Sequence, residues 1–263
     1  MRIGVFDSGL GGLTVVQAMT QVIKGAQIFY VADTKNAPYG EKTPEQILQY
    51  SLNITKYLIN THQIDALILA CNTATSYAIR HLREIYPSLI IIGTEPGIKP
   101  AIEQTKTGKI GVLATPATLQ GDKYKQLTQA LSSQKRVDIF EQACHGLVQQ
   151  IEKGEIESAE TISLLEKWLA PMRENNVDTI VLGCTHYPLV GQNIEKIMDC
   201  NVRLIHTGEA ISKHLLTLGS EKGHLNEGDL QIHIHTTGEI QVQVIDSIIE
   251  KYENIHVIEI ESQ

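Results

Sequence analysis

Short apolar runs alternate with segments of helical periodicity along most of the chain. The first four runs have the length and the β-branched content of buried strands, and they cover residues 2–6, 27–31, 66–70 and 89–92. Amphipathic segments separate them, such as the stretch from Pro44 to Thr61, whose proline suits the first helical turn. This alternation predicts an α/β fold in which a mainly parallel sheet is flanked by helices.

The same pattern then occurs a second time. Strand-like runs cover residues 109–113, 136–140, 179–183 and 202–205, in the same order and at a similar offset from the first four. The repeat predicts two pseudo-symmetric α/β domains that face each other across a cleft. We expect the first domain to span residues 1–96 and the second 97–207. Residues 208–263 lie outside the repeat, and we expect them to complete the first domain.

The third strand of each set ends in a cysteine. The two strand ends read Ala70-Cys71-Asn72-Thr73 and Gly183-Cys184-Thr185-His186. Parallel sheets bind ligands at the carboxyl ends of their strands, and polar side chains beside a cysteine favour its reactive thiolate form. A lone cysteine is more often a small buried hydrophobe. Its recurrence at the equivalent strand end, with polar residues after it both times, favours a functional pair.

Two thiols on opposite sides of a tetrahedral carbon could remove a proton from one face and supply one to the other. A zinc site is an alternative, because Cys184 and His186 are suitable ligands and His233 and His235 would share one strand face. A hydrolase with a single Cys–His pair is another alternative. Against zinc, neither cysteine lies in a C-x-x-C pair, and Asn72 and Thr73 are poor zinc ligands. The hydrolase would leave Cys71 without a role.

Composition and charge exclude several other classes. The chain has 263 residues, 42% of them hydrophobic and 20% charged, and a formal net charge of −8, which argues against nucleic-acid or membrane binding. Its N-terminus enters a strand pattern directly, and no apolar run approaches the ~20 residues of a membrane span. Four cysteines without a secretory signal indicate reduced thiols, so we expect a cytoplasmic protein. Neither a dinucleotide fingerprint nor a Walker P-loop is present.

Four segments resemble the signatures of glutamate racemases, within the aspartate/glutamate racemase family. They are Phe6 to Val15, Pro38 to Glu41, Ala70 to Thr75 and Gly183 to Pro188, and they occur in the family's order over nearly the whole chain. The resemblance implies an isomerase that interconverts L-glutamate and D-glutamate without a metal or any other cofactor. It also implies that the D-glutamate supplies peptidoglycan synthesis, and hence cell-wall biogenesis and cell shape.

The resemblance carries residue roles to matching positions. Cys71 is implied as the base for D-glutamate and Cys184 as the base for L-glutamate, with Asp7 supporting the first and His186 the second. The residues implied to bind substrate are Asp7, Ser8, Pro38, Tyr39, Gly40, Asn72, Thr73, Thr115, Thr185 and His186.

The resemblance also places an acidic catalytic residue near the second cysteine, and Glu152 occupies that position. In this segment His145 and Gln149 stand where the family usually has prolines, a departure that could change the shape of the loop. Cys144 and Cys200 match no catalytic motif, and we expect both to be structural.

Three alternatives concern substrate, class and assembly. The same two-thiol site could serve a racemase or decarboxylase of another acidic substrate, such as aspartate. Two lobes around a cleft are also typical of small-ligand binding proteins. A homodimer is compatible with the resemblance but is not indicated by any pattern in the sequence.

Overall fold

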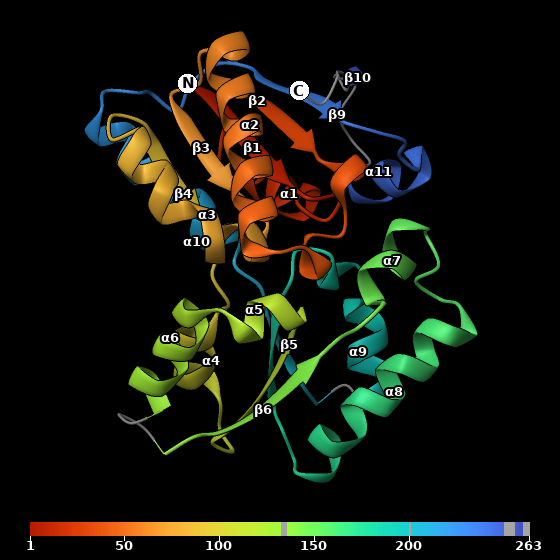
Figure 1. Cartoon of the computed structure of the whole chain (residues 1–263). Coiled ribbons are helices and arrows are strands. Elements are labelled where there is room, and N and C mark those ends of the chain that lie inside the picture. Colours follow the sequence, from red (N-terminus) through yellow and green to blue (C-terminus); the bar gives the residue numbers. More distant parts are fainter. Residues whose placement is uncertain (133–135, 200, 250–255, 260–263) are drawn as a thin grey trace. The chain divides into compact units, whose positions relative to one another are not determined.

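The computed structural model describes residues 1–132, 136–199, 201–249 and 256–259. The chain forms two compact units, one of Met1–Thr94 with Thr207–Gln263 and the other of Glu95–His206. Each unit contains its own sheet (Figure 1). The sequence predicted domain boundaries after residues 96 and 207, and these boundaries remain predictions.

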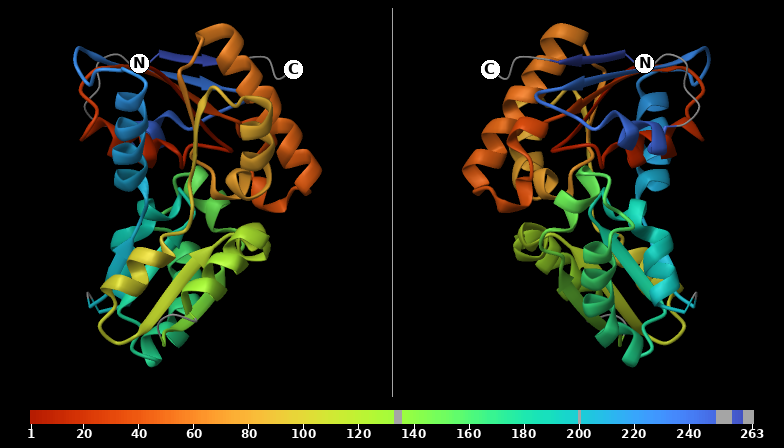
Figure 2. Two further views of the ribbon diagram at one scale, coloured as in Figure 1. Left: turned by 90° about the vertical axis from the view of Figure 1, so that its left-hand side faces the viewer. Right: turned by 90° about the vertical axis from the view of Figure 1, so that its right-hand side faces the viewer.

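The first unit contains a six-stranded sheet in the order β10-β9-β2-β1-β3-β4, with every neighbouring pair parallel. Its strands are β1 (Arg2–Asp7), β2 (Ala26–Ala32), β3 (Ala66–Leu69), β4 (Ile90–Gly93), β9 (Leu230–Thr236) and β10 (His256–Glu259). Its helices are α1 (Leu13–Thr20), α2 (Pro44–His62), α3 (Asn72–Ile85), α10 (Gly208–Glu221) and α11 (Val242–Ile248), with 3₁₀ turns η1 (Thr34–Asn36) and η2 (Tyr39–Glu41). Helices α2 and α3 cover one face of this sheet, and α1 and α10 cover the other (Figure 2).

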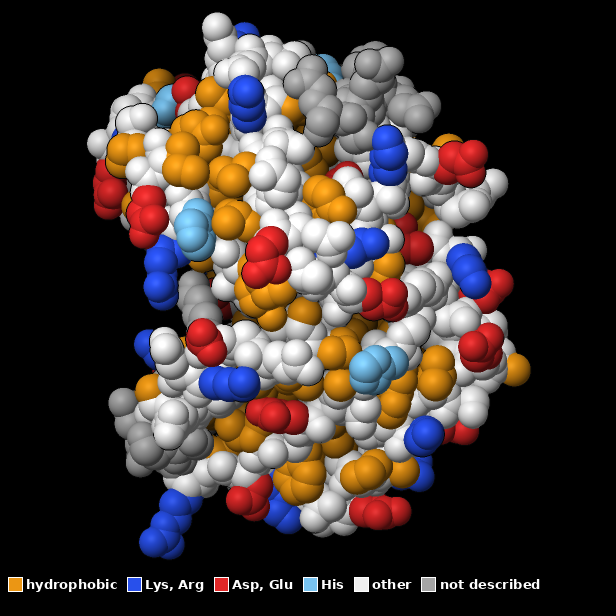
Figure 3. Space-filling model, in the orientation of Figure 1, with side chains coloured by type: hydrophobic (Ala, Val, Ile, Leu, Met, Phe, Trp, Pro, Cys, Tyr) orange, Lys and Arg blue, Asp and Glu red, His pale blue; other side chains and the backbone are white. Residues whose placement is uncertain are grey.

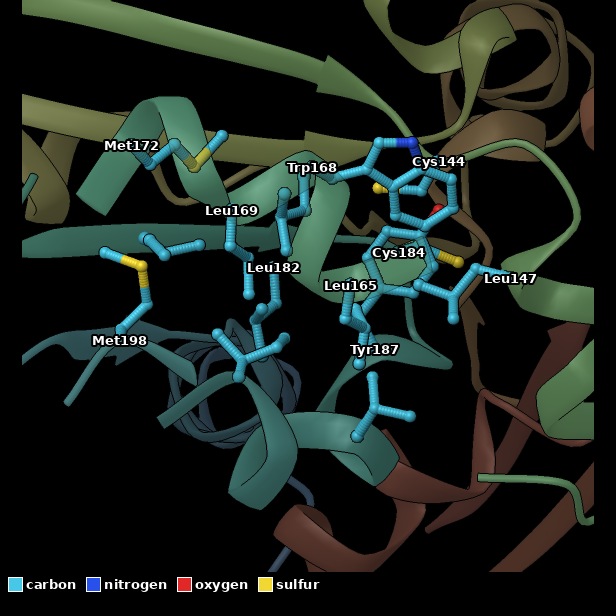
Figure 4. Close-up of a cluster of buried hydrophobic side chains, with 14 of the residues drawn as sticks. Cys144, Leu147, Leu165, Trp168, Leu169, Met172, Leu182, Cys184, Tyr187 and Met198 are labelled. Carbon is cyan, nitrogen blue, oxygen red and sulfur yellow. The ribbon is translucent and has the colours of Figure 1, made fainter. Parts of the chain in front are cut away.

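The second unit contains a four-stranded sheet in the order β6-β5-β7-β8, again all parallel. Its strands are β5 (Lys109–Ala114), β6 (Asp138–Ala143), β7 (Thr179–Gly183) and β8 (Arg203–Ile205). Its helices are α4 (Ile98–Gln104), α5 (Pro116–Gln120), α6 (Asp122–Ser132), α7 (Leu147–Glu152), α8 (Ala159–Glu174) and α9 (Gly191–Ile197), with the 3₁₀ turn η3 (Tyr187–Val190). One apolar cluster of this unit joins α7, α8 and α9 to the sheet (Figure 4).

The two sheets share a strand order. The first contains β2-β1-β3-β4 and the second β6-β5-β7-β8, so each strand of the second sheet occupies the place of its counterpart in the first. The prediction of an α/β fold with a duplicated, mainly parallel sheet is therefore confirmed. The C-terminal segment extends the first sheet, because β9 pairs with β2 and β10 pairs with β9.

The shared order fixes where the two cysteines lie. β3 and β7 occupy equivalent positions, and Cys71 and Cys184 follow their carboxyl ends. Each cysteine thus lies at the edge of its sheet where parallel strands present ligand-binding residues.

No helix in the described part of the chain is both long enough and apolar enough to cross a membrane. On the face shown in Figure 3, acidic and basic side chains are interspersed instead of gathering by sign.

A histidine cluster packs on the α2 face of the first sheet. His62 at the end of α2 and His233 on β9 both stack on Phe29, with ring centroids 4.1 Å and 5.1 Å away. His235 is 3% exposed, and its Nδ1 lies 2.9 Å from the hydroxyl of Tyr57. Burial, together with the neighbouring His62 and His233, lowers the pKa of His235 to about 4.

This cluster predicts a loss of stability in mild acid. An unfolded histidine has a pKa near 6.5, so as the pH falls from 6.5 toward 4 the unfolded chain binds a proton that folded His235 does not. We expect the free energy of unfolding to fall by about 2 kcal/mol between pH 7.5 and pH 5 from this group alone. Denaturant titrations of the wild type and of His235→Asn at both pH values measure it. The same loss in both proteins would contradict the assignment to His235.

Candidate functional site

Cys71 is the N-cap residue of α3. Its Sγ accepts a hydrogen bond from the backbone N–H of Ala74 at 3.4 Å, and its thiol donates to Oγ of Ser8 at 3.7 Å. The side chain is buried, with 6% exposure. A sulfur at a helix N-terminus that receives a backbone N–H is favoured in its anionic form. Cys71 therefore lies with its sulfur between a helix N-terminus and the hydroxyl of Ser8.

Asp7 ends β1, the strand beside β3, and is fully buried. Its Oδ1 accepts a hydrogen bond from the backbone N–H of Gly9 at 2.8 Å, which turns the glycine-rich loop over the end of the strand. A Cβ at Gly12 would lie 2.6 Å from Cβ of Asp7 and 2.9 Å from the hydroxyl of Tyr30. Glycine is needed at this position because only a residue without a side chain lets the loop pack this closely.

Tyr39 lies in η2 and is 1% exposed. Its hydroxyl donates to Oδ2 of Asp33 at 2.5 Å. Burial, the carboxylate of Asp33 and the nearby Cys71 and Asp7 raise the pKa of Tyr39 well above its usual value, so the side chain is a neutral phenol. Tyr39 and Cys71 belong to one cluster of buried side chains in the first unit. Pro38 and Gly40 flank Tyr39 in the same loop.

The first turn of α3 carries two further predicted residues. Asn72 and Thr73 are both buried. Within the described chain, the amide Nδ2 of Asn72 is buried with no hydrogen-bond partner. Buried polar groups are almost always paired, so an unpaired donor marks a position where a ligand acceptor would be stabilised. The first unit thus gathers all its predicted site residues at the carboxyl ends of β1, β2 and β3.

Cys184 has a different environment in the second unit. Its Sγ lies 3.6 Å from Nδ1 of His186, and Nε2 of His186 lies 2.5 Å from Oε1 of Glu152. Burial alone would lower the pKa of His186, but its contacts with Cys184 and Glu152 outweigh burial and raise the pKa well above the usual value. The imidazole is therefore protonated and places a positive charge beside the sulfur.

Glu152 reaches His186 because it is the last residue of the short helix α7. The chain enters this helix through Gly146, whose φ of 81° lies in the left-handed region that favours glycine. His145 is exposed and Gln149 lies within α7, so the two departures from the usual prolines still leave a helix that presents Glu152 to the histidine.

Thr115 and Thr185 lie at the same edge of the second sheet. Thr115 follows β5 and caps α5, with its Oγ1 accepting from the backbone N–H of Thr118 at 3.2 Å. The pairing of Ala114 with Gly183 sets it beside the Cys184 strand. Thr185 directly follows Cys184 and is buried.

Cys144 follows β6 at this edge and packs in the cluster that contains Cys184 and Tyr187 (Figure 4). Burial raises the pKa of Cys144 to about 12, so its thiol is neutral at physiological pH and cannot act as a base. This agrees with its expected structural role. Cys200 lies outside the described residues.

Two relations were missed by sequence reasoning. Asp33, the buried partner of Tyr39, carries only a weak signal, namely an acidic residue directly after the second strand. The resemblance placed Glu152 near the second cysteine, but no periodicity indicates its direct contact with His186, 34 positions along the chain. The described residues hold no group of three or more His, Cys, Asp or Glu side chains that could bind a metal ion.

The chain is an α/β protein with two related parallel sheets, and each sheet carries a cysteine after the same strand. The family model for Asp/Glu/Hydantoin racemases matches residues 3–215. The chain belongs to this family. The resemblance found in the sequence is confirmed, and so is the prediction of an amino-acid racemase among the isomerases.

Individual relatives agree with the family model. The glutamate racemase of Sulfurovum sp. (strain NBC37-1) is 67% identical over 253 residues, which are 96% of each chain. The crystal structure of a glutamate racemase isoform from Bacillus anthracis matches with a TM-score of 0.83 at 32% identity, covering 98% of this chain and 97% of that one. The structure of glutamate racemase from Francisella tularensis subsp. tularensis SCHU S4 in complex with D-glutamate also matches with a TM-score of 0.83. Its identity is 27%, with 100% of this chain and 98% of that chain covered.

Proposed function

We propose that the protein interconverts L-glutamate and D-glutamate by proton transfer at Cα, with Cys71 and Cys184 as the two bases. The observation that carries this proposal is the duplicated centre. Each cysteine follows the third strand of its sheet, and each has its own support for an anionic sulfur. The structure of a relative with D-glutamate bound supports the choice of substrate.

The proposed reaction needs one thiolate and one thiol at the same time. In the direction from L-glutamate, the Cys184 thiolate takes the Cα proton, and the protonated His186 stabilises the thiolate before the transfer. The thiol of Cys71 then gives its proton to the opposite face of the carbanion, which forms D-glutamate. The protein is left with a thiol at Cys184 and a thiolate at Cys71, and is ready for the reverse direction.

The residues around the two cysteines would hold the substrate. The unpaired Nδ2 of Asn72 suits a carboxylate oxygen, as do the hydroxyls of Ser8, Thr73 and Thr185. Asp7 carries a carboxylate that would attract the substrate ammonium. We propose that Pro38, Tyr39, Gly40 and Thr115 also contact the bound substrate. The cleft between the two domains, in which these groups would meet one substrate, belongs to this proposal.

The wider role follows from the reaction. D-glutamate from this enzyme would supply peptidoglycan synthesis and thereby cell-wall biogenesis and cell shape. A mechanism with two reduced thiols favours a reducing compartment, so we propose the cytoplasm. We propose that catalysis uses no metal or other cofactor. A homodimer stays a prediction, and the relatives set aside the alternative of a non-enzymatic binding protein.

Comparing substrates tests the proposed function. Pure protein, dialysed against a chelator and given no cofactor, is incubated with L-glutamate and separately with L-aspartate, and both enantiomers are separated by chiral chromatography. We expect D-glutamate to form and aspartate to react at least about a hundredfold more slowly, because misplacing the distal carboxylate by one methylene leaves buried polar groups unpaired. Faster racemisation or decarboxylation of aspartate would assign the protein to another acidic substrate.

A further inference from the structure

Asp33 is a buried carboxylate at the carboxyl end of β2, with 1% exposure. Three side chains donate hydrogen bonds to it. Asn36 donates to both oxygens at 3.1 Å, the hydroxyl of Tyr39 donates to Oδ2 at 2.5 Å, and the hydroxyl of Thr237 donates to Oδ1 at 2.7 Å. A charge removed from water needs such donors, and each of these bonds is strengthened by the charge. Two donors come from the same loop, whereas Thr237 lies 204 residues later in the chain.

Thr237 makes more than one contact with this loop. While its hydroxyl donates to Asp33, its Oγ1 accepts from the backbone N–H of Lys35 at 3.2 Å. Its own backbone N–H donates to the carbonyl of Ala32 at 3.1 Å. It is buried, with 7% exposure. One threonine therefore joins the carboxylate and the backbone of the loop to the end of β9.

The neighbouring residues strengthen the attachment. Oγ1 of Thr236 lies 3.0 Å from Oγ1 of Thr34. A Cβ at Gly238 would lie 3.3 Å from the backbone nitrogen of Lys35, which shows how closely the two segments pack. These residues lie beyond position 215, where the match to the family model ends.

We propose that Thr237 is a positioning residue for substrate binding, which acts on Tyr39 and Gly40 through Asp33 and the backbone of Lys35. This inference rests on the proposed function, because it assumes that the loop around Tyr39 binds the substrate. Thr237 touches no reacting atom in this account. Its hydroxyl keeps Asp33 in place, and Asp33 holds the phenol of Tyr39 in the buried cluster that also contains Cys71.

The test removes one hydroxyl and retains the shape of the side chain. Thr237→Val is compared with Thr55→Val, a control that deletes a buried hydroxyl bonded to the Ser51 carbonyl within α2. Thr237→Ser restores the hydroxyl, and Thr237→Ala serves under the same criteria if the valine variant does not fold. The readouts are KM and kcat for L-glutamate, and the hydrogen exchange of the Lys35 amide followed by NMR.

We expect Thr237→Val to raise KM about tenfold, because it removes one charge-assisted hydrogen bond from the support of the loop. We expect kcat to change less than about threefold. Exchange of the Lys35 amide should accelerate at least about tenfold, whereas Thr237→Ser and Thr55→Val should stay near the wild type in both readouts. Unchanged KM and unchanged exchange in Thr237→Val would overturn the inference. So would an equal rise of KM in Thr55→Val. If the wild type fails to racemise glutamate, that result overturns the proposed function and with it the positioning role, whereas unchanged exchange of the Lys35 amide in Thr237→Val overturns this inference alone.

Discussion

Cys71→Ser and Cys184→Ser should each lose racemisation of glutamate by about a thousandfold or more. A serine hydroxyl has the shape of the thiol but is far too weak an acid to form an anion in this range of pH, so either change removes one of the two proton-transfer groups. Both directions should fail in both variants, since every turnover uses both cysteines. Chiral chromatography of the product after long incubation measures the loss.

Cys144→Ser is the matched control for these variants. It changes another buried cysteine at the same sheet edge of the second unit, whose raised pKa keeps it neutral. We expect it to keep activity within about tenfold, since it carries no proton in the mechanism. Full activity in either Cys71→Ser or Cys184→Ser would refute a role as base for that residue.

His186→Asn should lower kcat/KM by about a hundredfold, because the neutral amide removes the positive charge beside Cys184. The fall must be equal in both directions, since the equilibrium constant between two enantiomers is one. The kinetic isotope effect distinguishes the directions. It should rise more for α-deuterated L-glutamate than for α-deuterated D-glutamate, because removal of the L proton by Cys184 becomes the slower step.

Two further variants serve as comparisons for His186→Asn. Glu152→Gln should have a smaller effect, about tenfold, because Glu152 touches the histidine and not the sulfur. His145→Asn changes an exposed histidine near the same helix and should have no effect. Isotope effects that rise equally for both enantiomers in His186→Asn would contradict its assignment to the Cys184 side.

Local sequence patterns predicted the fold because buried parallel strands leave a strong signal. The apolar runs ending at Cys71 and Cys184 became β3 and β7, and the helix predicted from Pro44 to Thr61 became α2, Pro44–His62. The prediction was weakest at β6. The sequence indicated residues 136–140, whereas the strand spans Asp138–Ala143. This strand lies at the edge of its sheet and is only partly buried, so its side chains alternate less clearly between apolar and polar.

The positions of the two cysteines at equivalent strand ends could be predicted from the sequence, whereas the contacts between residues far apart in the chain could not. A cysteine after a buried strand is a local feature, and its duplication is visible in the sequence. The bonds from Glu152 to His186 and from Thr237 to Asp33 depend on how distant segments pack. No local periodicity encodes such contacts, so they emerge only from the folded chain.

The central claim is that two thiols exchange the Cα proton of glutamate. The most direct measurement incubates the wild type with L-glutamate in deuterium oxide, follows the α-proton by NMR and separates the enantiomers at low conversion. The account predicts deuterium at Cα in nearly all of the D-glutamate formed, since the donating thiol exchanges with solvent, and almost none in the remaining L-glutamate. Retention of the α-proton signal in glutamate, with no deuterated D-glutamate formed, would contradict it.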